Sequence, residues 1–250
     1  MTASPAWPQG YALKEFASLD STNDEARRLA LAGEKGPLWL TAAQQTAGRG
    51  RRGRIWIVPA DNLAATLLLR PEKTAAEAAQ LSFVAALAAA DVIRAFAPAN
   101  RIAVKWPNDV LADGRKIAGI LLESASSDGR LDWLAVGIGM NLRLYPDDTE
   151  FPATSLAALG ECVPSPREAL THLAAHWAKW YERWNASGFG NIRDAWIVQA
   201  AFIGQRIRAR LHNEEAFGVF EGLDETGALI LREAQGRVRT IAAGDVFFGD

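Results

Sequence analysis

The sequence predicts an α+β fold, in which a mixed, largely antiparallel sheet with helices packed on it precedes a small C-terminal β-barrel. Two turn signals carry the first part of this prediction. Asp113-Gly114 and Asp128-Gly129 each lie between apolar runs, which is typical of β-hairpins. The runs around them therefore form an antiparallel meander, 110–112, 116–123 and 131–138.

The prediction of a C-terminal barrel rests on a change in the sequence pattern after Gly204. Short β-rich runs separated by turns follow, at 207–211, 217–223, 228–232 and 238–242. Regular short strands of this kind favour a small barrel. We therefore divide the chain into a larger domain, residues 1–202, and a C-terminal barrel, residues 203–250.

Strands and helices alternate ahead of the meander. Apolar or alternating runs predict strands over 11–19, 38–43, 62–69 and 102–105. Ser21 followed by acidic Asp24 is a helix-start signal, and this helix runs to about Ala32 before Gly33. Helical spacing predicts three more helices, over 74–96, 166–185 and 191–201. The tryptophans of the predicted helix 166–185, at 177, 180 and 184, are interpreted as core residues.

Composition narrows the class of protein. The formal net charge is −2 and the pI is about 6.0, which argues against a general nucleic-acid binder. Cys162 is the only cysteine, so disulfides are excluded and a reducing cytoplasm is expected. The first ten residues lack a secretory-signal pattern. Residues 75–97 carry polar interruptions and predict a buried helix instead of a membrane span.

The segment Gly48–Arg54 concentrates positive charge and glycine in one loop. Its glycines at 48, 50 and 53 match G-x-G-x-x-G, but strand-like residues 54–59 follow where a dinucleotide fingerprint needs a helix. Arginine forks suit carboxylate and phosphate groups, and glycine lets the backbone approach a ligand. We expect a loop that orders over an anion; the plainer interpretation is a solvated basic turn.

Three further segments are candidates for the same site. Lys105–Asp109 combines a cation, an aromatic ring, an amide and a carboxylate, although Pro-Asn-Asp is also an ordinary turn. Lys116 enters an apolar strand, where it is either solvent-facing or held by an anion, and Gly119 indicates a close approach. Gly137–Asn141 is a weaker signal of the same kind. His172 and His176 have a metal-compatible spacing, but a structural role is favoured.

In combination, these segments resemble the biotin protein ligases. The resemblance rests on five motifs that occur in order, Asp20–Asn23, Gln45–Arg54 with Trp56, Lys105–Asp109, Lys116–Leu121 and Gly137–Asn141. It covers nearly the whole chain and implies a biotin/lipoate ligase-like fold with an SH3-like C-terminal barrel. It also implies two reactions, in which biotin and MgATP give biotinyl-5′-AMP and the biotinyl group then passes to a lysine of a biotin carboxyl carrier protein of acetyl-CoA carboxylase.

The resemblance also implies roles for individual residues. The catalytic residues are Lys116 and Arg51. The biotin-binding residues are Ser21, Thr22, Asn23, Gln45, Arg49, Gly50, Arg51, Lys116 and Gly119. The nucleotide-binding residues are Arg51, Arg54, Trp56, Asn108, Asp109, Lys116 and Asn141, with Asp109 as the Mg²⁺ ligand.

Partners and alternatives follow from the same resemblance. Some family members carry an N-terminal DNA-binding domain, for which the residues ahead of Asp20 are too few, so no DNA partner is expected. No membrane partner is expected either, and a homodimer is compatible with the family. A lipoate ligase or octanoyltransferase is the alternative enzyme. A non-catalytic biotin or adenylate sensor is the alternative outside the enzymes, although the intact Lys116 and Arg51 argue against it.

Overall fold

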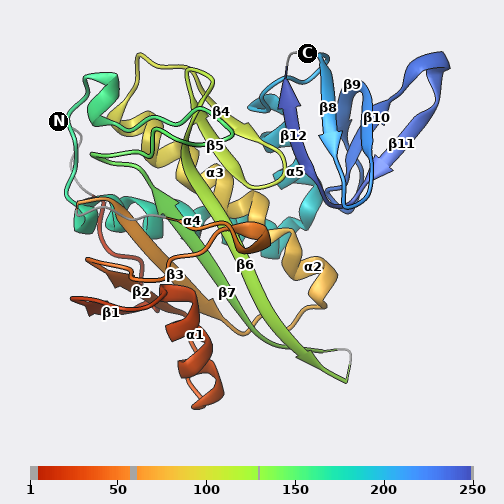
Figure 1. The fold of residues 1–250 in the computed structure, drawn as a ribbon. Helices are drawn as coiled ribbons and strands as arrows, with labels where there is room; N and C mark the ends of the chain where they lie inside the picture. Colours follow the sequence, from red (N-terminus) through yellow and green to blue (C-terminus); the bar gives the residue numbers. More distant parts are fainter. Residues whose placement is uncertain (1–4, 57–60, 129, 249–250) are drawn as a thin grey trace.

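The computed structural model describes residues 5–56, 61–128 and 130–248, and Figure 1 shows them as two β-sheets with helices. The predicted strand-like residues 57–59 and the second turn residue of Asp128-Gly129 lie outside the described residues. The larger sheet has seven strands in the order β1-β2-β3-β7-β6-β5-β4. Its strands are β1 (Ala12–Phe16), β2 (Leu38–Ala42), β3 (Leu63–Leu69), β4 (Ile102–Lys105), β5 (Asp109–Ala112), β6 (Arg115–Ser127) and β7 (Arg130–Met140).

Only one pair of neighbours in this sheet is parallel. β1 runs parallel to β2, and every other neighbouring pair is antiparallel. The predicted meander is confirmed as β5, β6 and β7, and the Asp113-Gly114 turn adopts positive φ at both residues, as a type I′ hairpin requires. β6 and β7 form the longest hairpin, which places Gly119 opposite Gly139 and Leu121 opposite Gly137.

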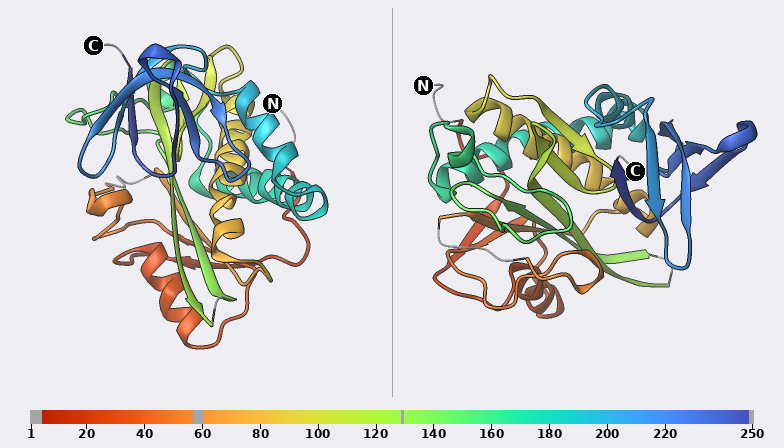
Figure 2. Two further views of the ribbon diagram at one scale, coloured as in Figure 1. Left: turned by 90° about the vertical axis from the view of Figure 1, so that its right-hand side faces the viewer. Right: turned by 45° about the horizontal axis from the view of Figure 1, so that its top comes forward.

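Helices cover both faces of this sheet (Figure 2). α1 (Thr22–Leu31) packs Ala26 and Ala30 against Leu38 and Leu40 on one face. The opposite face carries the main core, which α3 (Leu81–Phe96), α4 (Pro166–Ser187) and α5 (Phe189–Val198) cover. Side chains alternate between the faces of a strand, so Trp39 joins this second core while its neighbours Leu38 and Leu40 do not.

The predicted helix over 74–96 is two helices. α2 (Ala75–Ala79) ends at Gln80, and α3 begins at Leu81. Thr74 and Glu77 form a capping box that starts α2. Despite its polar interruptions, the stretch Ala75–Phe96 is long and apolar enough to cross a membrane. In this fold, however, 67% of its most apolar window is buried, as expected for a core helix.

The tryptophans of α4 are largely core residues, as predicted. Trp177 and Trp184 are buried, and Trp177 packs edge-on against Trp39. Trp180 is half-buried and donates its indole N–H to Asp91. His172 is also buried, with its ring against Phe96, which fits the structural role that the sequence favoured.

The C-terminal sheet has five antiparallel strands in the order β11-β10-β9-β8-β12. They are β8 (Arg206–Arg210), β9 (Glu215–Leu223), β10 (Leu229–Arg232), β11 (Val238–Ile241) and β12 (Asp245–Phe248). Within the described residues the edge strands β11 and β12 do not pair, so the expected SH3-like barrel is seen as an open sheet. Trp106 donates its indole N–H to Gly227 O and so joins the two sheets. The boundary between residues 202 and 203 stays a prediction.

Candidate functional site

A cavity of about 470 Å³ lies where the two sheets and the loop Gly48–Arg54 meet. Its walls come from the start of α1, this loop, the β4–β5 turn, β6, β7, residues 146–153 and β12. All of the predicted site residues line it: Ser21, Thr22, Asn23, Gln45, Arg49, Gly50, Arg51, Arg54, Trp56, Asn108, Asp109, Lys116, Gly119 and Asn141. The structure thus brings the five motifs together, while the role of each residue stays a prediction.

Uncharged hydrogen-bonding groups form one end of the cavity. Ser21 caps α1, and Thr22 donates from both its backbone N–H and its hydroxyl to Gln45 Oε1, at 2.8 and 3.0 Å. The hydroxyl of Thr66 lies 2.8 Å from Thr22 Oγ1 and 2.6 Å from Asn23 Oδ1. Gln45 is thereby fixed in orientation, which suits recognition of a polar, uncharged ligand group.

Two residues that support this end from behind Asn23, Thr66 and Glu123, were not predicted from the sequence. Asn23 donates its amide to Glu123 Oε2 at 2.8 Å, and Thr66 holds the other side of the same amide. Thr66 is the single polar residue in the otherwise apolar strand β3, and this contrast could have revealed it. Gly137 is needed beside them, because a Cβ there would overlap the Asn23 amide.

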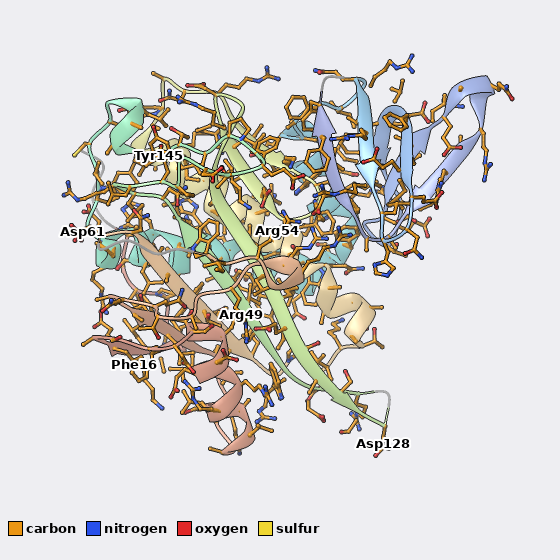
Figure 3. The ribbon with its side chains drawn as sticks, in the orientation of Figure 1. Phe16, Arg49, Arg54, Asp61, Asp128 and Tyr145 are labelled. Atoms are coloured by element: carbon orange, nitrogen blue, oxygen red, sulfur yellow. The ribbon has the colours of Figure 1, made fainter. Side chains whose placement is uncertain are left out.

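The arginine-rich loop is held by carboxylates from three elements. Arg49 donates to Asp24 at 2.8 Å and Glu123 at 3.2 Å. Arg52 and Arg54 reach Asp245 on β12 at 3.0 and 2.5 Å. In Figure 3, Arg49 therefore lies towards α1 and Arg54 towards the C-terminal sheet.

Asp245 is the main counter-ion of this loop, and the sequence did not reveal it. The residue is only 8% exposed, and Arg210 also donates to it at 3.3 Å. Burial alone would raise the pKa of its carboxyl group, but the guanidinium of Arg54 and its neighbours hold that pKa below the usual 3.8. Asp245 thus offsets part of the positive charge of Arg52 and Arg54 from within the chain itself.

Arg51 differs from the other arginines of the loop. It donates to Asn108 Oδ1 at 3.1 Å and to Gly244 O at 3.0 Å, and the closest approach to Asp245 is 4.0 Å. Burial lowers the pKa of Arg51. This guanidinium therefore spans the gap between the β4–β5 turn and the C-terminal sheet, across the mouth of the cationic end of the cavity.

Two lysines bracket the carboxylate of Asp109 at that cationic end. Lys116 Nζ lies 2.6 Å from Asp109 Oδ1 and Lys105 Nζ lies 3.8 Å from Oδ2. Burial lowers the pKa of Lys105 to about 8. Lys116 is thus held by an internal anion, one of the two outcomes expected for a lysine in an apolar strand.

Trp56 occupies the floor of the cavity between β6 and β7. Its ring lies 5.4 Å from Lys116 Nζ, and a Cβ on Gly139 would overlap it. Gly119 is also close to the ring, with 3.3 Å between a Cβ placed there and Trp56 Cζ3. Because Gly119 and Gly139 have no side chains, the backbone of this hairpin forms a flat surface against which the Trp56 ring packs.

The two asparagines predicted to bind the nucleotide, Asn108 and Asn141, donate to backbone carbonyls. Asn108 donates to Ile120 O at 2.5 Å and Asn141 to Thr154 O at 3.0 Å. Each amide ties one wall of the cavity to its neighbour, and direct ligand contacts by these side chains stay a prediction. No group of three or more metal-ligating side chains occurs within residues 5–56, 61–128 and 130–248.

The cavity therefore pairs a neutral, hydrogen-bonding end with a strongly cationic end, and an aromatic bed lies beside Lys116. Such a site suits a ligand with an uncharged polar head and an anionic tail next to a nucleotide. Comparisons with known proteins agree. The profile of the Biotin/lipoate A/B protein ligase family matches residues 15–141, and that of the Biotin protein ligase C terminal domain matches residues 202–249.

Individual relatives extend over nearly the whole chain. The Biotin--[acetyl-CoA-carboxylase] ligase of Paracoccus denitrificans is 49% identical over 241 residues, which cover 94% of this chain and 99% of that protein. The Mycobacterium tuberculosis protein of the same name is 32% identical, covering 98% of this chain and 90% of that protein. The structure of the biotin protein ligase from Aquifex aeolicus with biotin and ATP has a TM-score of 0.80 at 26% identity, covering 94% of this chain and 97% of that one. The chain belongs to the biotin protein ligase family.

Proposed function

We propose that the chain is an ATP-dependent biotin protein ligase. It forms biotinyl-5′-AMP and pyrophosphate from biotin and MgATP, then transfers the biotinyl group to one lysine of a biotin carboxyl carrier protein of acetyl-CoA carboxylase. The observation that carries this proposal is that one and the same cavity has a neutral end at Thr22 and Gln45 and a cationic end at Lys116. The family, and the relatives named for this reaction, support it.

The first reaction needs two anions to approach each other. An oxygen of the biotin carboxylate attacks the α-phosphorus, and the bond from that phosphorus to the leaving pyrophosphate breaks. Lys116, together with Arg51, opposes the repulsion between carboxylate and phosphate and stabilises the charge of the transition state. Gln45 and Thr22 hold the uncharged ureido ring at the far end, so that the carboxylate points at Lys116.

The second reaction transfers the activated acyl group. The neutral amine of the carrier lysine attacks the biotinyl carbonyl carbon, the bond from that carbon to the phosphate oxygen breaks, and AMP and one amine proton leave. No enzyme nucleophile is required, so the protein needs to hold the adenylate and exclude water. The loop Gly48–Arg54 is suited to this task, because it closes the cavity between α1 and β12.

One carboxylate of the cavity would hold the Mg²⁺ that accompanies the nucleotide. A single carboxylate with substrate phosphates is a usual Mg²⁺ environment, and Asp109 is the carboxylate placed for it between Lys105 and Lys116. When bound, the ion would neutralise phosphate charge. Asp109 would hold the ion, and Lys116 beside that carboxylate would face the phosphates.

A biotin-transfer assay tests the proposed function. Purified protein, biotin, MgATP and a carrier domain should give biotin-labelled carrier, and pyrophosphate release should depend on biotin. Calorimetric titration with biotin and with lipoate tests the alternative enzyme, because lipoate binding without biotin binding would contradict the proposal. Absence of pyrophosphate release would instead favour the sensor.

Location and partners are proposed on the same basis. We infer a cytoplasmic enzyme, since ATP is its co-substrate and the single cysteine, Cys162, is free and exposed. We also infer that it acts without DNA or a membrane. A homodimer through a sheet edge stays a prediction, which size-exclusion chromatography with light scattering would test.

A further inference from the structure

One buried amine in the cavity takes no part in the reactions described above. Lys105 ends β4 and is only 6% exposed. Its ammonium lies 3.9 Å from the ring centroid of Phe151 and 6.0 Å from that of Phe247 on β12. It makes no hydrogen bond to any residue in the part of the chain that the structure describes. Its nearest carboxylate is Asp109 at 3.8 Å, and Asp245 also attracts its charge from farther away.

Such an environment is unfavourable for a cation unless a ligand completes it. An ammonium has three N–H donors, and a buried donor without an acceptor is costly. The aromatic rings attract the charge, but they are much weaker acceptors than oxygen anions. Asp109 meets Lys116 at 2.6 Å on its other oxygen, so its closer contact is with that lysine. The donors of Lys105 therefore remain available to an anion in the cavity.

The position of Lys105 indicates which anion. Lys116 lies on the Trp56 and Gly119 side of Asp109, towards the neutral end of the cavity. Lys105 lies on the other side of the carboxylate, beside Phe247 of the C-terminal sheet. A nucleotide whose α-phosphate meets Lys116 would extend its remaining phosphates into this region.

We propose that Lys105 is a further catalytic residue, which binds the β- and γ-phosphates of the nucleotide and stabilises the pyrophosphate that leaves. This inference rests on the proposed function. When the biotin carboxylate oxygen bonds to the α-phosphorus, the electron pair of the broken P–O bond departs with pyrophosphate. The ammonium of Lys105 donates hydrogen bonds to the oxygens of the departing pyrophosphate, and no proton is transferred.

The test compares Lys105→Met, which keeps the apolar stem without the charge, with Lys105→Arg, which keeps a charge. Lys35→Met is the matched control, because Lys35 is exposed and its ammonium forms no hydrogen bond or ion pair within the described residues. Losing one charge-assisted contact should raise the KM for MgATP and the inhibition constant of pyrophosphate by roughly 10- to 100-fold in Lys105→Met. The KM for biotin should stay within about twofold, and Lys105→Arg should recover part of the loss.

A second measurement separates the leaving group from the α-phosphate. Biotinyl-5′-AMP supplied directly contains no pyrophosphate, so single-turnover transfer from it to the carrier should be unchanged in Lys105→Met. Slowed transfer, unchanged pyrophosphate inhibition, or an equal loss of biotin affinity would each overturn the inference. Lys105→Gln replaces the methionine variant if thermal melting shows that the latter does not fold. An inactive wild-type enzyme would instead contradict the proposed function itself.

Discussion

At the scale of single residues, Lys116 is the side chain on which the proposed chemistry depends most. Its ammonium is held by Asp109 beside Trp56, at the junction of the neutral and cationic ends of the cavity. Lys116→Ala should lower biotin-dependent pyrophosphate release by about 10²- to 10³-fold, because charge stabilisation in a closed site is lost. Single-turnover adenylation measures this, with Lys35→Ala as the control. Adenylation at the wild-type rate would remove Lys116 from the mechanism.

Gly137 carries a different kind of requirement, because it makes room for Asn23. The Asn23 amide is buried and bonded to Thr66 and Glu123, so it cannot move aside without losing both partners. Gly137→Ala should therefore lower the free energy of unfolding by about 1–3 kcal/mol. Gly190→Ala on α5, where a Cβ meets nothing within 4 Å, should be neutral or stabilising by up to about 1 kcal/mol. Chemical denaturation compares the two, and equal effects would contradict this explanation of Gly137.

Which residues could be predicted from the sequence depends on how far apart their partners lie. Thr22, Gln45 and Lys116 belong to short motifs, and the cavity gathers all of them. Glu123 looks like an ordinary charged residue late in a strand, and only the fold brings it to Asn23 and Arg49. Asp245 is separated from Arg54 by 191 residues, so no local pattern connects them.

At the scale of secondary-structure elements, the sequence predicted type and order better than ends. The meander β5–β7 was predictable because Asp-Gly pairs are typical of hairpin turns. Helix α1 was predictable because Ser21 caps its N-terminus. The break at Gln80 between α2 and α3 was not, because an alanine-rich run carries no stop signal. β12 was also missed, although its Asp245 holds the arginine-rich loop.

The loop Gly48–Arg54 gives the prediction that belongs to this scale. Asp245→Asn removes the charge that Arg52 and Arg54 share, which should lower the free energy of local opening by roughly 1–2 kcal/mol. Trypsin cleaves after arginine, so limited proteolysis within the loop should become about tenfold faster. Asp194→Asn is the matched control, because this exposed carboxylate on α5 pairs only with Arg193 among the residues that the structure describes. Similar cleavage rates in the two variants would show that Asp245 does not restrain the loop.

At the scale of the whole molecule, the site is shared between the two sheets. The larger sheet supplies Lys116 and the bed under Trp56, while β12 supplies Asp245 and Phe247. Arg210 of β8 joins Asp245 to Glu150 on the segment that also carries Phe151. Removal of the C-terminal sheet would therefore remove one wall of the cavity and the counter-ion of the loop together.

The ion pairs of Asp245 should make the thermal stability of the protein depend on pH. Asp245→Asn should abolish this contribution to the pH dependence. In the folded protein the pKa of Asp245 is held below its usual 3.8, so folding favours the ionised form of this carboxyl group. Its contribution is present above the unfolded-state pKa of 3.8 and is lost as the pH falls through the lower folded-state pKa. Thermal melts of wild type and Asp245→Asn should therefore differ most at neutral pH and converge below pH 3.8. A difference that persists unchanged into that acidic range would show that the carboxylate charge of Asp245 does not stabilise the contact between the loop and the C-terminal sheet.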